Sequence, residues 1–327
     1  MTVTLTGEQL DIHKRIMSIF YPHAMRRREH VIKNKIRFVH YTTAANALSI
    51  IRTKRMWMRN TTCMTDYREV QHGLDALNRY LAVAENKAAF DAALNECFPG
   101  SADETIGLFN SWWQTTQLNT YIASISEHDD REDLHGRLSM WRAFSGATAR
   151  VALVLKLPLE LGSNMALHAS LLPVSYFTDA DIAGEMGAVT VRIKENCDFL
   201  RKLDRNVFIG NVFAMFTTAV VCLKHEGFHE EREWRVIYEP KRNPSTLIDS
   251  SVEVIGGIPQ LVYKIPLENN SAAGISGLDP TDLLDRIILG PSQFPWVMYE
   301  AFVTTLDAAG VKDAASRVYA SQIPVRT

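Results

Sequence analysis

Hydrophobic residues recur at helical spacing in several parts of the 327-residue chain. After the capping-box sequence from Thr6 to Gln9, the isoleucines of the next ten residues fall on one helical face. The same spacing of three to four residues continues through about 67–119 and 180–223, and it returns at 294–309. The pattern therefore predicts an N-terminal helical extension over 1–36 and two helical insertions, at about 67–119 and 180–223.

Shorter hydrophobic runs, continuous or alternating with polar residues, predict eight or nine β-strands. Ten runs are candidates for these eight or nine strands, at 37–41, 56–58, 121–126, 151–157, 172–177, 234–238, near 252, and at 261–265, 286–289 and 317–323. Strands and helices alternate irregularly, and the sequence contains no glycine-rich phosphate loop, which argues against a doubly wound parallel sheet. We predict one α+β domain over 37–327, with a mixed, split central β-sheet interrupted by the two helical insertions.

The charges of the chain are nearly balanced, with 35 Lys and Arg residues against 37 Asp and Glu residues. This balance predicts no general nucleic-acid-binding surface. A local basic run, Arg26-Arg27-Arg28, has two interpretations. A solvated helix end explains it more simply than a phosphate-binding site.

The cysteines and the N-terminus bear on the cellular compartment. Cys63, Cys97, Cys197 and Cys222 form no Cys-x-x-Cys pair, and the first residues show no targeting pattern. Both features predict reduced thiols in a cytoplasmic protein. The apolar stretch 207–223 is shorter than the roughly 20 residues of a membrane span, so we interpret it as a buried helix and predict no membrane association.

The densest group of charged side chains lies in Lys224–Arg235, directly before a predicted strand. Alternate residues of a strand point the same way, so Glu231, Glu233 and Arg235 should share one face. Two carboxylates held together can have their proton affinities pushed apart, which suits acid–base catalysis or the stabilisation of a cationic transition state. The alternative is a salt-bridged strand start with Trp234 turned into the core.

The same stretch contains His225-Glu226-Gly227-Phe228-His229, which matches the His-Glu-x-x-His signature of zinc peptidases. On a helix the two histidines would share a face and bind zinc, with Glu226 as general base. Gly227 weakens a helix at this position, and no third ligand follows on an obvious helix. We therefore predict no metal site and keep a zinc-dependent hydrolase as a minor alternative.

Polar groups at the ends of other predicted strands occur in a characteristic order. The order begins with His40-Tyr41 on the first strand and continues with Asn60, Asp66, Glu69, Ser126, Trp141, Gly146, Lys224 and Glu231–Arg235. The tail sequences Ile288–Pro291 and Ser321–Arg326 complete it. In this order of residues, over about 37–326, the chain resembles domain-of-unknown-function family 2971 of bacteria.

Two positions depart from the family pattern. Phe144 stands where a tyrosine is usual, so a hydroxyl is missing there. Phe228 replaces a tryptophan, which we expect to affect only packing.

The layout is also similar, more distantly, to that of ADP-ribosyltransferases, which implies NAD as substrate. The resemblance implies that His40 grips the nicotinamide-side ribose and that Tyr41 or Trp141 stacks on the ring. Glu233 would stabilise the oxocarbenium ion as nicotinamide leaves, and Glu231 would serve the acceptor. A fixed anion beside a cationic transition state is what such chemistry requires.

The resemblance also implies how the site is arranged. Asn60, Ser126 and Arg235 should complete the NAD site. His40 and Glu233 should lie on adjacent or facing strands, with side chains in one cleft.

The functional prediction is NAD-dependent ADP-ribosyl transfer or NAD glycohydrolysis, in a bacterial toxin or phage-defence role that only the resemblance implies. The acceptor is open between a protein, a nucleic acid and a small molecule, and so is the oligomeric state. The rival function is a non-catalytic module that binds a nucleotide or a partner in the same cleft.

Overall fold

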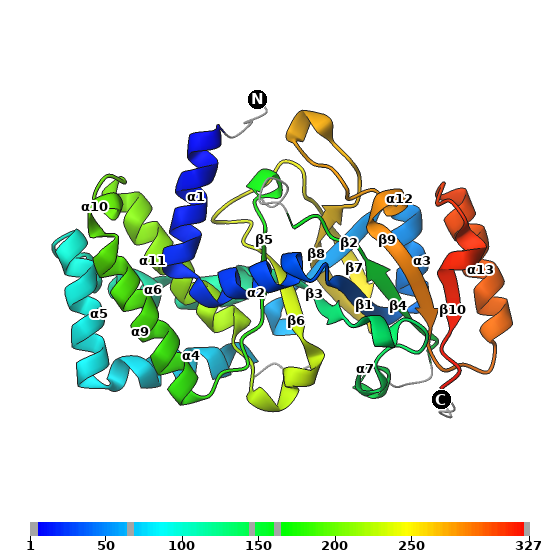
Figure 1. Ribbon diagram of the computed structural model, residues 1–327, viewed down its shortest axis with the longest axis horizontal. Helices are drawn as coiled ribbons and strands as arrows, with labels where there is room; N and C mark the ends of the chain where they lie inside the picture. Colours follow the sequence, from blue (N-terminus) through cyan, green and yellow to red (C-terminus); the bar gives the residue numbers. More distant parts are fainter. Residues whose placement is uncertain (1–5, 64–68, 144–147, 160–164, 324–327) are drawn as a thin grey trace.

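The computed structural model describes residues 6–63, 69–143, 148–159 and 165–323. Within these ranges the chain forms a ten-stranded sheet with a body of helices beside it (Figure 1). The strands are β1 (Arg37–Thr43), β2 (Arg55–Asn60), β3 (Tyr121–His128), β4 (Arg150–Leu155), β5 (Ser170–Pro173), β6 (Glu233–Tyr238), β7 (Asp249–Ile255), β8 (Ile258–Pro266), β9 (Leu284–Leu289) and β10 (Val318–Ala320).

The sheet is mixed, because β9 and β10 are parallel and the other strand pairs are antiparallel. Its main path runs β10-β9-β4-β1-β3-β2-β8-β7, and β6 joins β3 to β5 outside that path. The prediction of an α+β fold with a mixed central sheet is therefore confirmed.

Strand β3 is the point at which the sheet divides. One edge of β3 pairs with β6 from Tyr121 to Ser126. The other edge pairs with β2 at Tyr121 and Ile122, and with β1 from Ser126 to His128. Two wings of the sheet therefore diverge from β3, one continuing through β1 and the other through β2.

The α-helices fall into two groups (Figure 1). Those beside or over the sheet are α3 (Ala44–Thr53), α7 (Leu138–Ala143), α12 (Pro280–Leu283) and α13 (Pro295–Ala308). The helical body contains α1 (Gly7–Phe20), α4 (Glu69–Ala82), α5 (Ala84–Cys97), α6 (Ser101–Asn119), α9 (Asp179–Glu195), α10 (Cys197–Leu200) and α11 (Arg205–Cys222). Helix α2 (Pro22–Lys33) runs from this body across to the sheet (Figure 1), and its Val31 lies in the sheet core. Short 3₁₀ helices are η1 (Thr61–Cys63), η2 (Asp130–Glu132), η3 (Glu226–Glu231), η4 (Ser271–Ala273) and η5 (Ala314–Arg317).

Two hydrophobic cores correspond to this division. The helical core is built around Phe90, Phe208 and Phe216, and it also takes in Ile19 of α1. The N-terminal helix and both predicted insertions thus pack into one body.

The sheet core lies under α3 and α13. The opposite face of the sheet is covered by two smaller clusters, one with α7 and one with the end of α11.

Helix α11 connects the two cores. By length and composition it could cross a membrane, but 56 % of its 18 residues are buried within the protein. Phe208 and Phe216 belong to the helical core, whereas Val221 and Cys222 pack on β3, β5 and β6. All four cysteines lie in the described part of the chain and are free thiols.

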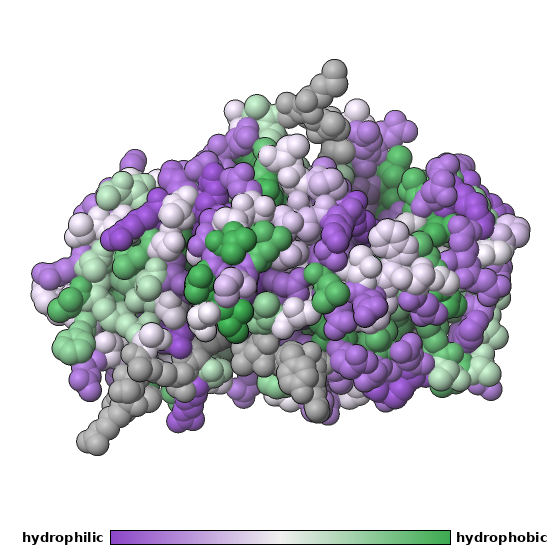
Figure 2. Space-filling model, turned by 180° about the vertical axis from the view of Figure 1, so that it is seen from behind, coloured by the Kyte–Doolittle hydropathy of each residue, from purple (hydrophilic) through white to green (hydrophobic). Residues whose placement is uncertain are grey.

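Figure 2 shows the face behind that of Figure 1, where hydrophobic residues form small patches separated by hydrophilic ones. The edge strand β7 and its neighbour β8 expose Val252, Val254 and Ile258 to solvent. Scattered apolar side chains of this kind are usual on protein surfaces.

Candidate functional site

Five ionisable side chains gather on the sheet face that α4 and α11 cover. Glu233 and Arg235 come from β6, Glu69 from the start of α4, Lys224 from the residues after α11, and Glu231 from η3. All except Glu231 are less than a tenth exposed. Three carboxylates and two cations thus share one buried cluster, which we call the charge cluster.

The local backbone explains why the side chains of β6 converge there. Arg232 ends η3 in the left-handed region, with φ 45°, and the strand begins at the next residue. From that start, strand alternation puts Glu233 and Arg235 on one face and Trp234 on the other. Trp234 lies in the sheet core, as the sequence pattern predicts.

Glu233 is held on several sides. Arg235 donates from Nε to Glu233 Oε1 at 2.8 Å and from Nη2 to Oε2 at 3.0 Å, and Ser124 Oγ donates to Oε1 at 2.5 Å. The backbone N–H of Glu233 donates to the hydroxyl of Tyr176 at 2.9 Å. Burial opposes the charge of Glu233, but Arg235, Lys224 and Ser124 outweigh it and lower the pKa to about 2.

Glu231 has the opposite electrostatic character. Its carboxylate accepts a hydrogen bond from Lys224 Nζ at 2.7 Å, and its side chain is 26 % exposed. Burial raises the pKa of Glu231, against the opposing effect of Lys224. The same ammonium lies 3.5 Å from Glu233, so two neighbouring carboxylates contact one cation while their pKa values move in opposite directions.

Arg235 anchors the cluster to the rest of the fold. Its guanidinium is 1 % exposed, contacts Glu69 at 2.5 Å and donates to the carbonyl of Val221. Glu69 in turn pairs with Lys224 at 2.7 Å. The sequence predicts that Arg235 contacts NAD, but the geometry favours a role in holding the carboxylates in place.

His40 does not share the face of the charge cluster, so the prediction that His40 and Glu233 share one cleft face is wrong. Glu233 of β6 is paired with Ser126 of β3, and Ser126 is paired with Val39 of β1, so these three side chains point to the same face of the sheet. His40 is the next residue after Val39, so its side chain points to the other face. There it is paired with Leu153, which belongs to the sheet core. His40 contacts the cluster only indirectly, because its Nδ1 lies 2.9 Å from the backbone oxygen of Ser124.

Two aromatic candidates pack against each other. The rings of Tyr41 and Trp141 meet edge to face, with centroids 4.9 Å apart, and both are buried. The Tyr41 hydroxyl accepts from the backbone of Arg137 at 2.7 Å, and Trp141 Nε1 donates to His135 O at 2.7 Å. These contacts give both rings a structural role under the loop that precedes α7.

Two further predicted ligand-binding residues lie in different places. Asn60 donates to Leu118 O at 2.8 Å and accepts from Thr62, which ties the end of β2 to α6. Ser126 is buried directly opposite Glu233. Asp66, Phe144, Gly146 and the tail after Ile323 lie outside the described residues.

The His-Glu-x-x-His segment forms no α-helix: His225 is the N-cap of the 3₁₀ helix η3, with ψ 137°, and His229 lies within η3. The two histidines therefore do not share a helical face as the zinc-peptidase signature requires. His225 Nδ1 accepts from Gly227 N at 3.1 Å. Across the described ranges, no three His, Cys, Asp or Glu side chains form a group suited to a metal ion.

Phe228 has a role that the sequence did not suggest. The ammonium of Lys224 lies 4.7 Å from the centre of the Phe228 ring. An aromatic face at this distance attracts a cation, so the residue at this position affects Lys224 as well as packing.

Sequence reasoning undervalued Glu69 and missed Tyr176. Glu69 lies on the apolar face of α4, in line with Val70 and Gly73, where a charged residue is unexpected unless it has a partner. A charged residue at this position therefore indicates, from the sequence alone, that Glu69 has a buried partner. Tyr176 follows β5 in an irregular segment, and nothing in its neighbourhood indicates its contact with Glu233.

Comparison with protein families, curated proteins and solved structures found no match to this chain. The resemblances to family 2971 and to ADP-ribosyltransferases therefore stay predictions, and the chemistry of the charge cluster must support any function.

Proposed function

We propose that the charge cluster cleaves the bond between ribose and nicotinamide in NAD, with transfer of ADP-ribose to water or to an acceptor. The bond from the ribose carbon to the nicotinamide nitrogen breaks, and its electron pair leaves with nicotinamide. The incoming hydroxyl or amine attacks the resulting oxocarbenium ion and gives up a proton. An ADP-ribosyltransferase-like arrangement of the split sheet is part of this proposal.

One observation supports the proposal above the others: Glu231 and Glu233 contact the same ammonium, yet their pKa values are driven apart. Glu233 is a fixed anion at neutral pH, suited to stabilising a developing positive charge. Glu231 is more exposed and has a raised pKa, as suits a group that accepts the proton of the attacking nucleophile. Environments that separate two carboxylates in this way define acid–base roles.

The substrate would approach from the side of Glu231, since Ser124 and Tyr176 are also partly exposed there. His40 has no role on this face in the proposal. Cytoplasmic location in a bacterium, and a toxin or defence role, belong to the same proposal and rest on the family resemblance alone.

The test is incubation of the purified protein with NAD and measurement of free nicotinamide by chromatography. We expect Glu233→Gln to keep the shape and lower the rate about a hundred- to a thousandfold, because the anion is lost. Glu231→Gln should reduce transfer to an acceptor more than hydrolysis by water. Glu230→Gln, a change at an exposed residue of η3, is the matched control and should retain the parent rate.

A non-catalytic binding module is the second candidate, favoured by the full engagement of Arg235 within the protein. If the parent binds NAD without releasing nicotinamide, the binding module is supported. Parent-like turnover by Glu233→Gln would contradict the assignment of the fixed anion.

A further inference from the structure

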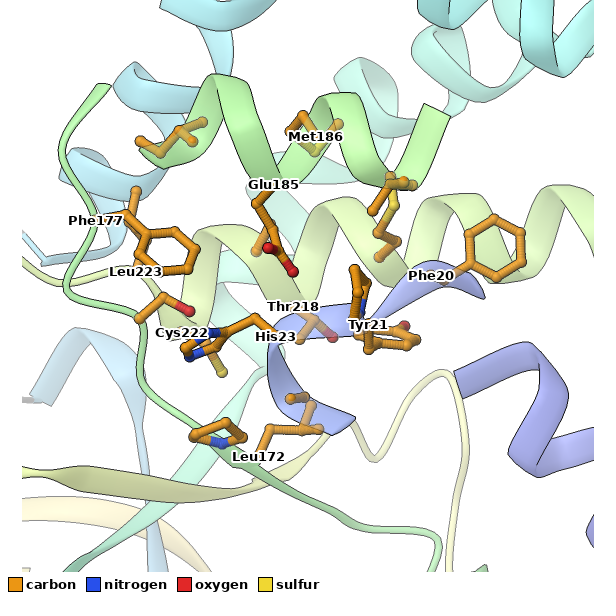
Figure 3. Close-up of a pocket in the computed structure, with 18 of the residues that line it drawn as sticks. Phe20, Tyr21, His23, Leu172, Phe177, Glu185, Met186, Thr218, Cys222 and Leu223 are labelled. Carbon is orange, nitrogen blue, oxygen red and sulfur yellow. The ribbon is translucent and has the colours of Figure 1, made fainter. Parts of the chain in front are cut away.

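A second site lies between the helical body and strand β5, and no residue of the charge cluster lines it. A cavity of about 110 Å³ opens between the turn that joins α1 to α2, helices α9 and α11, and strand β5 (Figure 3). Its walls are mainly apolar and include Leu172, Phe177, Met186 and Leu223. Engineered apolar cavities of comparable size accept a single benzene ring, so this space suits one ring better than a lone water molecule.

Two polar atoms in this wall lack partners. His23 Nε2 and Glu185 Oε1 are buried and form no hydrogen bond within the described part of the protein. Figure 3 shows Glu185 pointing from α9 toward the start of α2, where His23 lies. Buried polar groups are rarely left unsatisfied, and those that are need an explanation such as a bound molecule.

The surrounding contacts hold both groups in place. The other oxygen of Glu185 binds Arg26 Nη2 at 2.6 Å, which fixes the carboxylate while leaving Oε1 unused. The His23 ring meets Phe177 edge to face, with centroids 4.8 Å apart. Burial lowers the pKa of His23 to about 4, so its ring is neutral at physiological pH.

We propose that this cavity binds a small, uncharged aromatic molecule that carries an N–H donor beside a hydrogen-bond acceptor, as in an aromatic carboxamide. The ring would occupy the apolar walls, and the N–H would donate to Glu185 Oε1. The neighbouring acceptor would accept a hydrogen bond from His23 Nε2, in the tautomer that carries the proton on that nitrogen. An anionic ligand is disfavoured, because Glu185 already supplies a negative charge.

Three single-ring probes distinguish binding through the shape of the ring from binding through hydrogen bonds. The probes are benzamide, toluene and benzoate. We expect benzamide to bind at least about tenfold more tightly than toluene, because hydrogen bonds to a charged group add that much to a shape match. Benzoate should bind more weakly than either. Affinities are measured by titration calorimetry, and a crystal structure with benzamide locates the ligand.

Three substitutions test whether the probes bind in this cavity. Ala219 lines the cavity, so Ala219→Leu should abolish binding of both benzamide and toluene. Glu185→Leu should bring benzamide down to the affinity of toluene while toluene still binds, which also shows that the cavity is intact. Glu195→Leu, an exposed change near the end of the same helix, is the control and should leave both affinities unchanged.

Several results would overturn the proposal. These are equal affinities of benzamide and toluene in the parent, binding that survives Ala219→Leu in a folded protein, or a cavity that contains only ordered water in crystals grown with benzamide. None of these measurements involves NAD, so the proposal stands or fails independently of the proposed function.

Discussion

Burial decides what each charged residue of this protein can do. Arg235 and Glu233 are removed from water, and breaking such a pair is strongly unfavourable because the remaining charge is left without compensation. Glu231 shares Lys224 with Glu233 but has no contact with Arg235, and its partial burial raises its pKa. Pairing with Arg235 thus separates a fixed anion from a group that can exchange protons.

The burial of His23 predicts a testable pH dependence of protein stability. Its pKa falls from 6.5 to about 4 on folding, because burial disfavours the charged ring. The unfolded chain therefore binds more protons between these values, and the free energy of unfolding should fall by about 3 kcal/mol as the pH drops from 6.5 to 4.

The measurement is urea unfolding at several pH values for the parent and for His23→Phe, which keeps an aromatic ring that cannot titrate. Between pH 6.5 and 4 the free energy of unfolding should fall less steeply in the variant than in the parent, because only the contribution of His23 is removed. The same slope in both proteins would show that His23 does not contribute.

At the scale of elements, periodicity predicted the existence of most helices and strands. The predicted strands at 121–126 and 234–238 correspond to β3 and β6, and the helix predicted at 294–309 corresponds to α13. Alternation also placed Trp234 in the core. Each of these results depends only on residues close together in the sequence, which is where pattern reasoning is strongest.

The sequence could not predict the register between strands, which decides which of their faces coincide. Alternation identifies the two faces of β1 but does not say which one matches the Glu233 face of β6. A shift of one residue in the pairing exchanges the faces, and only the register through β3 fixes it. The error over His40 has this origin. The convergence of Glu69 and Tyr176 on Glu233 likewise depends on packing between elements distant in sequence.

The crossing of α4 and α11 allows a prediction about helix packing. A Cβ atom added at Gly73 would lie 2.2 Å from the backbone oxygen of Val220, so Gly73→Ala must push the two helices apart. Overpacking of this kind typically lowers stability by about 1 to 3 kcal/mol. The free energy of unfolding is measured by chemical denaturation.

Gly107 provides the matched control, since it lies inside α6, is exposed, and would have no atom within 4 Å of an added Cβ. Gly107→Ala should raise stability by up to about 1 kcal/mol, because alanine favours helix more than glycine does. If both variants raised stability, helix propensity would dominate and the close crossing would not matter.

At the scale of the whole molecule, helix α11 joins the two hydrophobic cores. It runs from the helical core to the sheet, and the charge cluster lies where they meet. Within that cluster Arg235 of β6 pairs with Glu69 of α4, so this buried ion pair is one of the contacts that link the sheet to the helical body. We therefore expect the helical body and the sheet to unfold together.

Arg235→Leu tests this coupling. It leaves Glu233 and Glu69 buried without their main partner, which should lower the free energy of unfolding by about 3 to 5 kcal/mol. Because the contact belongs to both bodies, far-ultraviolet circular dichroism and tryptophan fluorescence should shift to lower denaturant by the same amount. Arg131→Leu, a change at an exposed residue that pairs with Asp129, is the control and should leave stability nearly unchanged. If the two signals shifted by different amounts, the helical body and the sheet would unfold independently, and the charge cluster would not couple the two cores.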